Sequence, residues 1–369
     1  MLYRKHLAQA FTYKSGRPPE DLLKAKGIKK VYPLASNENY LGPSPKALEA
    51  INKAKNEIHI YPDTLCSELR EKIAKLYHVN VDNTLIGAGS SELISMLYTA
   101  FLEPDERVLK PNPSFMLYKV LASFMNLQCE DFQLNPDFSY NIDTIIEKNT
   151  PETKIIIVVS PNNPTGTIIT QQQMDKLISS LRKDQILVVD EAYIEFNDAE
   201  NSYDDLIKKA VDDNYEKNII VLRTFSKVYA LAGLRLGYLF AKKQIVEGFL
   251  KVLKPFTVTS LAEKAGVASL DDTLFVNKSI QLVKDGRKKF YSEFDRLNLD
   301  YTKGYGNFIF IKTLDINKVS EAFLEKGVVV RPCAQFGYEQ AVRITYGDAE
   351  ANDQVVKVIK ENLDLFKRK

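Results

Sequence analysis

The sequence predicts an α/β protein with a mostly parallel central sheet, helices on both faces of that sheet, and a smaller α+β part after it. Three apolar runs at residues 154–159, 185–189 and 218–222 support this prediction, because they are rich in β-branched residues and do not alternate with polar ones. Such runs are typical of strands buried on both faces. A helical pattern at 171–182 lies between the first two runs. This alternation indicates parallel strands joined by right-handed crossovers.

The remaining patterns divide the chain into an arm and two domains. Residues 1–40 are polar and broken by glycine and proline, and they predict an arm with one short helix near 20–26. Residues 41–245 form the predicted large domain, and residues 246–369 the predicted small C-terminal domain. Further helices are expected at 45–55, 67–77, 92–101, 114–125, 316–326 and 351–366, with a helical region at 245–297 interrupted near 255–259 and 271–272. Further strands are expected at 84–87, 107–110, 304–311, 328–331 and 342–345.

Composition and charge exclude several classes of protein. The 50 Lys and Arg residues against 48 Asp and Glu give a net charge of +2, so the sequence predicts neither a nucleic-acid partner nor an anionic membrane partner. No apolar run approaches the length of a membrane span, and the first residues lead into no apolar signal segment. The 3 cysteines and 3 histidines are scattered, so we expect no disulfide framework and no metal site. A reducing, cytoplasmic location fits this cysteine usage.

Polar residues follow four of the predicted strands. Lys227 follows the strand at 218–222 together with Thr224 and Ser226, and Arg235 comes eight positions later. A lysine amine can form a Schiff base with a carbonyl group, while hydroxyls and a guanidinium can hold a phosphate. The segment Gly89-Ser90-Ser91 follows the strand at 84–87 at a predicted helix start, which also suits an anion. The combination points to a phosphorylated carbonyl cofactor, and pyridoxal 5′-phosphate has both groups.

The other two strands end in Asn163-Pro164-Thr165-Gly166 and in Asp190-Glu191-Ala192-Tyr193. Each polar segment alone has a structural explanation. Asp190 could be a helix N-cap, the first segment is a good turn sequence, and Lys227 could be a solvated lysine. Ligands in doubly wound sheets bind at the carboxyl ends of the strands. Four polar segments at those ends therefore predict one shared site.

These segments resemble a known family. Asn163-Pro164-Thr165-Gly166, Asp190-Glu191-Ala192-Tyr193 and Ser226-Lys227 with Arg235 are similar to the fold type I pyridoxal-phosphate-dependent aminotransferases. Within that class the chain most resembles the histidinol-phosphate aminotransferases. This resemblance lies in Tyr13-Lys14-Ser15-Gly16-Arg17, Leu34-Ala35-Ser36-Asn37-Glu38-Asn39, Ala230-Leu231-Ala232-Gly233-Leu234-Arg235, Val330-Arg331 and Val342-Arg343-Ile344-Thr345. It covers nearly the whole chain and implies that residues 41–245 bind the cofactor.

The resemblance implies a role for each cofactor residue. Lys227 would bind the cofactor covalently and then act as the base that moves the substrate proton. Asp190 would pair with the pyridinium nitrogen and keep it protonated. Asn163 and Tyr193 would donate hydrogen bonds to the ring oxygen, and Phe115 would stack on the ring where the family often has tyrosine. The phosphate ligands would be Gly89, Ser90, Ser91, Thr224, Ser226 and Arg235.

The resemblance also implies substrate residues and a partner. Arg343 would bind the α-carboxylate of an amino acid, and Arg331 would help it to bind the distal phosphate of the substrate, with a surface ion pair as the alternative for Arg331. Tyr13 and Asn37 would line the substrate side, although Asn37 could instead cap a turn. Tyr61 would reach the cofactor phosphate of the neighbouring subunit, which implies a homodimer with shared active sites. An ordinary half-buried aromatic is the alternative for Tyr61.

The function that the resemblance implies is transamination of L-histidinol phosphate with 2-oxoglutarate, giving imidazole-acetol phosphate and L-glutamate in histidine biosynthesis. An aromatic amino-acid aminotransferase would have the same scaffold. A threonine-phosphate decarboxylase would share the cofactor site and the need for phosphate-binding arginines. A regulator that binds pyridoxal phosphate is the alternative outside catalysis, although the sequence contains no DNA-binding module or linker.

Overall fold

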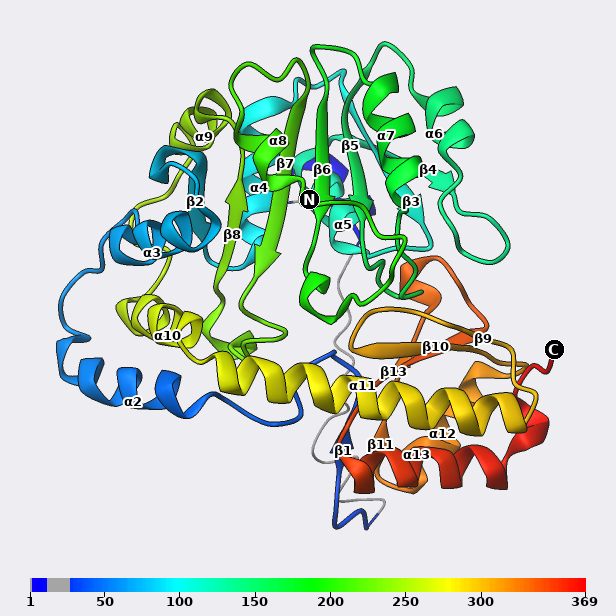
Figure 1. Cartoon of the computed structure of the whole chain (residues 1–369). Helices are drawn as coiled ribbons and strands as arrows, with labels where there is room; N and C mark the ends of the chain where they lie inside the picture. Colours follow the sequence, from blue (N-terminus) through cyan, green and yellow to red (C-terminus); the bar gives the residue numbers. More distant parts are fainter. Residues whose placement is uncertain (1, 12–26) are drawn as a thin grey trace.

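The computed structural model describes residues 2–11 and 27–369 (Figure 1). The predicted helix near 20–26 and the predicted substrate residue Tyr13 lie outside the described residues. No helix of the described part is long and apolar enough to cross a membrane.

The central sheet has seven strands in the order β2-β8-β7-β6-β5-β3-β4. Its strands are β2 (Thr84–Gly87), β3 (Arg107–Asn112), β4 (Gln128–Gln133), β5 (Thr153–Val159), β6 (Ile186–Asp190), β7 (Asn218–Thr224) and β8 (Gly237–Phe240). The pairs from β7 through β6, β5 and β3 to β4 are parallel, while β8 runs antiparallel to both of its neighbours. The predicted α/β class with a mostly parallel sheet is confirmed.

Alternate residues of the central strands pack into two separate apolar cores, one on each face of the sheet. Ile156 and Val158 of β5 lie in one core with α3 (Ser67–Tyr77), α6 (Ile142–Lys148), α7 (Gln171–Ser180) and α8 (Ile207–Val211). Ile155 and Ile157 lie in the other core with α4 (Ser90–Phe101), α5 (Leu117–Met125) and α9 (Lys243–Leu250). Both faces of these strands are therefore buried, which explains why their sequences do not alternate with polar residues.

A second, antiparallel sheet lies below the first in Figure 1, in the order β12-β13-β10-β9. Its strands are β9 (Tyr301–Thr302), β10 (Phe308–Lys312), β12 (Arg331–Pro332) and β13 (Ala341–Thr345). The helices of this part are α11 (Thr273–Arg296), α12 (Ile316–Glu325) and α13 (Ala349–Glu361). A separate parallel pair joins β1 (Tyr32–Pro33) to β11 (Val328–Val329), so the end of the predicted arm adds to the C-terminal part.

Two predictions about the C-terminal part were wrong. The single strand expected at 328–331 is two strands, because β11 pairs with β1 while β12 pairs with β13 in the other sheet. The helix expected at 351–366 ends at Glu361, and a short 3-10 turn (Leu363–Leu365) follows it.

Helix α10 (Ser260–Leu270) packs beside α3 and α2 (Pro45–Ala54), although it belongs to the predicted small domain. The boundaries at residues 40 and 245 stay predictions.

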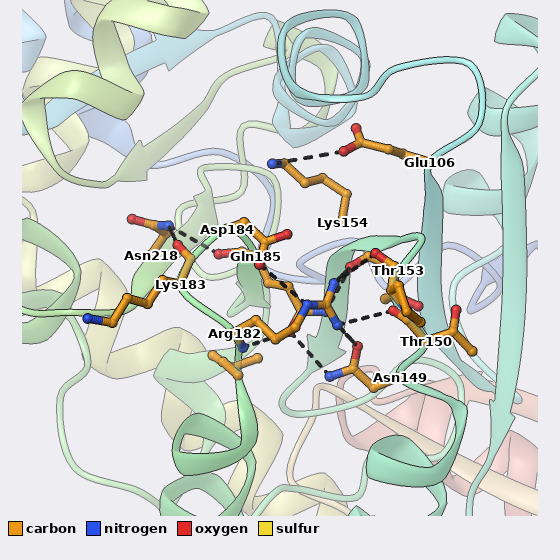
Figure 2. A network of polar contacts seen from close by, with 12 residues as sticks. Glu106, Asn149, Thr150, Thr153, Lys154, Arg182, Lys183, Asp184, Gln185 and Asn218 are labelled. Atoms are coloured by element: carbon orange, nitrogen blue, oxygen red, sulfur yellow. Dashed lines mark hydrogen bonds and ion pairs between the residues drawn. The ribbon is translucent and has the colours of Figure 1, made fainter.

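A polar network joins the amino ends of β5, β6 and β7 (Figure 2). The predicted site lies at the other end of these strands. The Arg182 guanidinium donates hydrogen bonds to Asn149 Oδ1 and to the carbonyl oxygens of Thr150 (both 3.1 Å) and Thr153 (2.8 Å). The Gln185 amide also donates to the Thr153 carbonyl (2.7 Å), and Asn218 Nδ2 donates to the Gln185 carbonyl (3.2 Å). These bonds give the backbone carbonyl groups at this end of the sheet side-chain donors.

We expect Arg182→Met to lower the free energy of unfolding by about 1.5–3 kcal/mol, since several acceptors lose a charged donor at once. Turnover should stay unchanged, because the network lies at the far end of the strands from the predicted site. Chemical denaturation and steady-state rates would measure both effects. The matched control is Lys183→Met. Lys183 is an exposed neighbour whose ion pair with Glu216 spans 3.6 Å, and its loss should cost less than about 0.5 kcal/mol.

Candidate active site

The carboxyl ends of the central strands border a cavity of about 210 Å³, and most of the predicted site residues line it. Lys227, Asp190, Tyr193, Asn163, Phe115, Ser90, Ser91, Thr224, Ser226, Arg235, Arg331 and Arg343 are among the lining residues. The four polar segments that the sequence places after four separate strands therefore meet in space. Gly89, Asn37 and Tyr61 are described but are not among the lining residues.

Lys227 lies between the two parts of the molecule. Its Nζ donates a hydrogen bond to the Ser36 carbonyl (3.2 Å) and lies 5.5 Å from the centroid of the Tyr193 ring. Burial lowers the pKa of Lys227 to about 7, and the positive charges of Arg343 and Arg235 act in the same direction. A large share of this amine is therefore unprotonated near neutral pH, which is the form that attacks a carbonyl.

Asp190, the last residue of β6, is 4% exposed. The Tyr118 hydroxyl donates to its Oδ2 (2.6 Å), and the Ala192 amide donates to its Oδ1 (3.0 Å). Burial raises the pKa of Asp190, while both hydrogen bonds oppose that shift. No α-helix begins directly after this residue, so the alternative explanation as a helix N-cap is wrong. A buried carboxylate that lines the cavity and is held by hydrogen bonds to both oxygens is suited to a cationic partner there.

One end of the cavity gathers an anion-binding group. The Arg235 guanidinium approaches the Ser91 hydroxyl (3.3 Å) and the Ser226 hydroxyl (3.5 Å), and Thr224 Oγ1 lies 3.0 Å from Ser226 Oγ. These groups surround the amino end of α4, whose first residue is Ser90. A helix amino terminus, hydroxyls and a guanidinium all favour a phosphate.

Gly89 supports this anion-binding group without lining the cavity. Its φ of +80° is unfavourable for other residues, and a Cβ there would lie 2.5 Å from Arg235 Nη2. Any other residue at this position would be strained by its φ, and its Cβ would displace the guanidinium of Arg235.

Asn163 and Tyr193 join the two parts of the molecule at the centre of the site. Asn163 Nδ2 lies 3.4 Å from the Tyr193 hydroxyl, and Arg343 Nη1 donates to Asn163 Oδ1 (2.5 Å). Asn37 Nδ2 also donates to the Tyr193 hydroxyl (3.0 Å), and its backbone has a left-handed φ of 55°. Asn37 is fully buried. It contacts Tyr193 from the buried side, and its predicted role on the substrate side stays a prediction.

Arg331 and Arg343 lie directly opposite each other on the paired strands β12 and β13. Their exposed fractions are 6% and 4%, so the alternative of a surface ion pair for Arg331 is wrong. Two guanidinium groups that line one cavity favour an anionic ligand there.

Tyr61 lies away from the cavity of its own chain. Its side chain is 80% exposed and stacks on Phe256, with ring centroids 4.7 Å apart. The alternative of an ordinary half-buried aromatic is therefore wrong. A large exposed ring of this kind is available to another molecule.

Sequence reasoning missed several residues of the site. Tyr118, the donor to Asp190, lies within the apolar face of a helix, where a tyrosine is indistinguishable from a core residue. Phe336 lines the cavity from a short turn after β12 that has no sequence signature. Ser36 contributes a backbone carbonyl, which no side-chain pattern can reveal.

Comparison with known proteins agrees with this geometry. The model of the family "Aminotransferase class I and II" matches residues 29–359. The chain is 36% identical to a histidinol-phosphate aminotransferase of Moorella thermoacetica over 95% of this chain and 90% of the relative. It is 35% identical to histidinol-phosphate aminotransferase 2 of Carboxydothermus hydrogenoformans, over 99% of this chain and 100% of the relative.

Solved structures share the fold. The histidinol-phosphate aminotransferase of Sinorhizobium meliloti, in complex with pyridoxal 5′-phosphate, superposes with a TM-score of 0.84 at 20% identity and covers 98% of each chain. An aspartate aminotransferase of Thermotoga maritima superposes with a TM-score of 0.85 at 18% identity, over 98% of this chain and all of the other. The chain belongs to the class I and II aminotransferases, and within them to the family of histidinol-phosphate aminotransferases.

Pyridoxal 5′-phosphate is the cofactor of these enzymes and of this chain, and the side chains present fit it. The amine of Lys227 suits its aldehyde, the buried Asp190 suits its pyridinium nitrogen, and the group around Arg235 suits its phosphate. The assignment of each of these residues to an atom of the cofactor stays a prediction.

The pKa of Lys227 can be tested on the cofactor-free protein. Because its pKa is lowered to about 7, the rate of pyridoxal 5′-phosphate capture should rise with pH up to about 7 and then level off. A lysine with the ordinary value of 10.5 would instead give a rate that climbs about tenfold per pH unit through pH 9. Stopped-flow visible absorbance measures this profile. Arg343→Met removes a nearby positive charge, so it should move the midpoint to higher pH, and an unmoved midpoint would contradict the electrostatic explanation.

Proposed function

We propose that the protein transfers an amino group from L-histidinol phosphate to 2-oxoglutarate, giving imidazole-acetol phosphate and L-glutamate in the biosynthesis of histidine. One observation carries this proposal: two buried arginines, Arg331 and Arg343, face each other across β12 and β13 and line the same cavity as Lys227. The names of the relatives at 35–36% identity agree with it.

The residues of the chain account for the chemical steps. The bound cofactor supplies an electron sink for the bond broken at the substrate α-carbon. Lys227, whose pKa burial lowers to about 7, would remove the proton from that carbon and later return it at the other end of the transfer. Asp190, whose carboxylate is oriented by Tyr118, would keep a proton on the pyridinium nitrogen. Tyr193 and Asn163 would donate hydrogen bonds to the ring oxygen.

The two arginines explain how one pocket accepts both substrates. Histidinol phosphate has a phosphate and no α-carboxylate, whereas glutamate has two carboxylates and no phosphate. Arg343 binds the α-carboxylate of glutamate, and Arg331 with Arg343 binds the phosphate of histidinol phosphate in the other half-reaction. Guanidinium groups bind both kinds of anion through paired hydrogen bonds.

We also propose a homodimer in which Tyr61 completes the partner's phosphate site. Ile58, Ile60, Tyr61 and Phe256 are exposed apolar side chains, with exposed fractions of 67%, 58%, 80% and 44%, and Tyr61 stacks on Phe256. Exposed apolar side chains of this kind are typical of an interface. We propose a cytoplasmic location, because free thiols persist in a reducing compartment and the chain has three free cysteines, Cys66, Cys129 and Cys333.

The shared site can be tested with hybrid dimers. Tyr61→Ala and Lys227→Ala subunits, once mixed and exchanged, should form hybrids that contain one site with both wild-type residues. The activity of the mixture should exceed that of either variant alone. Each variant mixed with itself is the control. If native mass spectrometry shows subunit exchange and activity does not recover, Tyr61 does not act across the interface.

The substrate is tested with Arg331→Ala. A charged hydrogen bond contributes roughly 1.5–3 kcal/mol, so kcat/KM for histidinol phosphate should fall by about tenfold to a hundredfold. The value for phenylalanine, which has no phosphate, should fall far less. Equal losses on both substrates would favour an aromatic aminotransferase. Release of carbon dioxide from threonine phosphate, measured on the wild type, would favour the decarboxylase.

A further inference from the structure

The short turn η6 (Ala334–Phe336) follows β12 and lies next to the two arginines. It is fixed against the loop that leads from β3 to Phe115. The Phe336 carbonyl accepts a hydrogen bond from the Ser114 amide (3.0 Å). The turn closes at Gly337, where φ is +95° and a Cβ would lie 2.0 Å from Asn112 Oδ1. The turn therefore has little freedom to move relative to the large sheet.

The Phe336 ring lies beside both guanidinium groups. Its centroid is 5.4 Å from Arg331 Cζ and 5.2 Å from Arg343 Cζ, and its side chain is 4% exposed. Like charges directly opposite on paired strands repel each other. An aromatic face attracts a cation electrostatically, most strongly where water is excluded. One buried ring therefore contacts both guanidinium groups and stabilises them side by side.

Gln335 contacts one of the two arginines. Its Oε1 accepts a hydrogen bond from Arg331 Nη2 (2.9 Å), and its side chain is half-buried. An amide has no net charge, so it orients the guanidinium without neutralising it. A carboxylate at this position would compete with an anionic substrate. Gln335 thus restrains Arg331 alone, whereas its neighbour Phe336 restrains both arginines.

We propose that Gln335 and Phe336 are positioning residues that hold Arg331 and Arg343 as one binding unit for a phosphate monoester. The turn thereby sets the preference for an amino donor with a phosphate over one with only a carboxylate. This deepens the proposed function and rests on it for the identity of the amino donor. Binding of a phosphate monoester to the pair does not depend on that identity.

The test uses the cofactor-loaded enzyme in phosphate-free buffer, with phenyl phosphate and 3-phenylpropionate as probes. Gln335→Leu should weaken phenyl phosphate by about tenfold and 3-phenylpropionate by less than about twofold, because it acts on Arg331 only. Phe336→Leu should weaken both probes by at least about fivefold, whereas Phe336→Tyr, which keeps the ring, should stay within about twofold of the wild type. Calorimetric titration measures the dissociation constants.

Steady-state kinetics give a second measurement. For histidinol phosphate, Gln335→Leu should raise KM and leave kcat nearly unchanged. This is expected because the phosphate is bound equally in the ground state and the transition state. Two matched controls come from the same loop. Tyr338→Leu removes a ring that packs on Phe138 and Phe310, and Gln340→Leu removes an exposed amide that accepts from the Ile316 amide. Both controls should keep the affinity for phenyl phosphate within about twofold.

Three results would overturn the inference: equal weakening of both probes by Gln335→Leu, a Phe336→Tyr variant as weak as Phe336→Leu, or no effect of either position. Failure of the proposed function gives a different result. If histidinol phosphate is not transaminated but the variants weaken phenyl phosphate as expected, the donor is another phosphate monoester and the positioning role stands.

Discussion

The arrangement of the site depends on one hydrogen bond, which Arg343 Nη1 donates to Asn163 Oδ1 over 2.5 Å. Asn163 follows β5 of the large sheet, and Arg343 lies on β13 of the second sheet. The bonds of Asn37 and Asn163 to the Tyr193 hydroxyl extend this link to the segment beside β1. The residues proposed to orient the cofactor ring are therefore joined to the arginine proposed to bind a carboxylate, so the two halves of the site are held together by direct hydrogen bonds.

Electrostatics follow from that geometry. Lys227, Arg235, Arg331 and Arg343 line one cavity, and Asp190 is the acidic residue among its described lining. Burial weakens solvent screening, so each positive charge is felt by the others. Burial is the main cause of the lowered pKa of Lys227, and the positive charges of Arg343 and Arg235 add to it. The same positive charges make the cavity receptive to anions.

The sequence predicted best those elements whose residues are buried on both sides. Strands β5, β6 and β7 were predicted within a few residues, since a strand covered on both faces must be apolar throughout. Strand β4, an edge strand with the sequence QCEDFQ, was missed because most of its residues are polar. Strand β8 was missed because it is only four residues long and directly follows the segment around Arg235. Local patterns contain no information about which sheet a short strand joins, and this is why residues 328–331 were read as one strand.

The sequence by itself determined the fold class, the family and most of the side chains that line the cavity, because those residues are set by chemistry and follow directly on strongly patterned strands. Tertiary structure alone decided how the site is held together. Asn37 proved to be a buried donor to Tyr193, Tyr118 a donor to Asp190, and Phe336 a ring shared by two arginines. These contacts join residues 72 to 156 positions apart or depend on the course of a short turn. Spacing along the chain cannot reveal them, because they arise only when separate elements pack against each other.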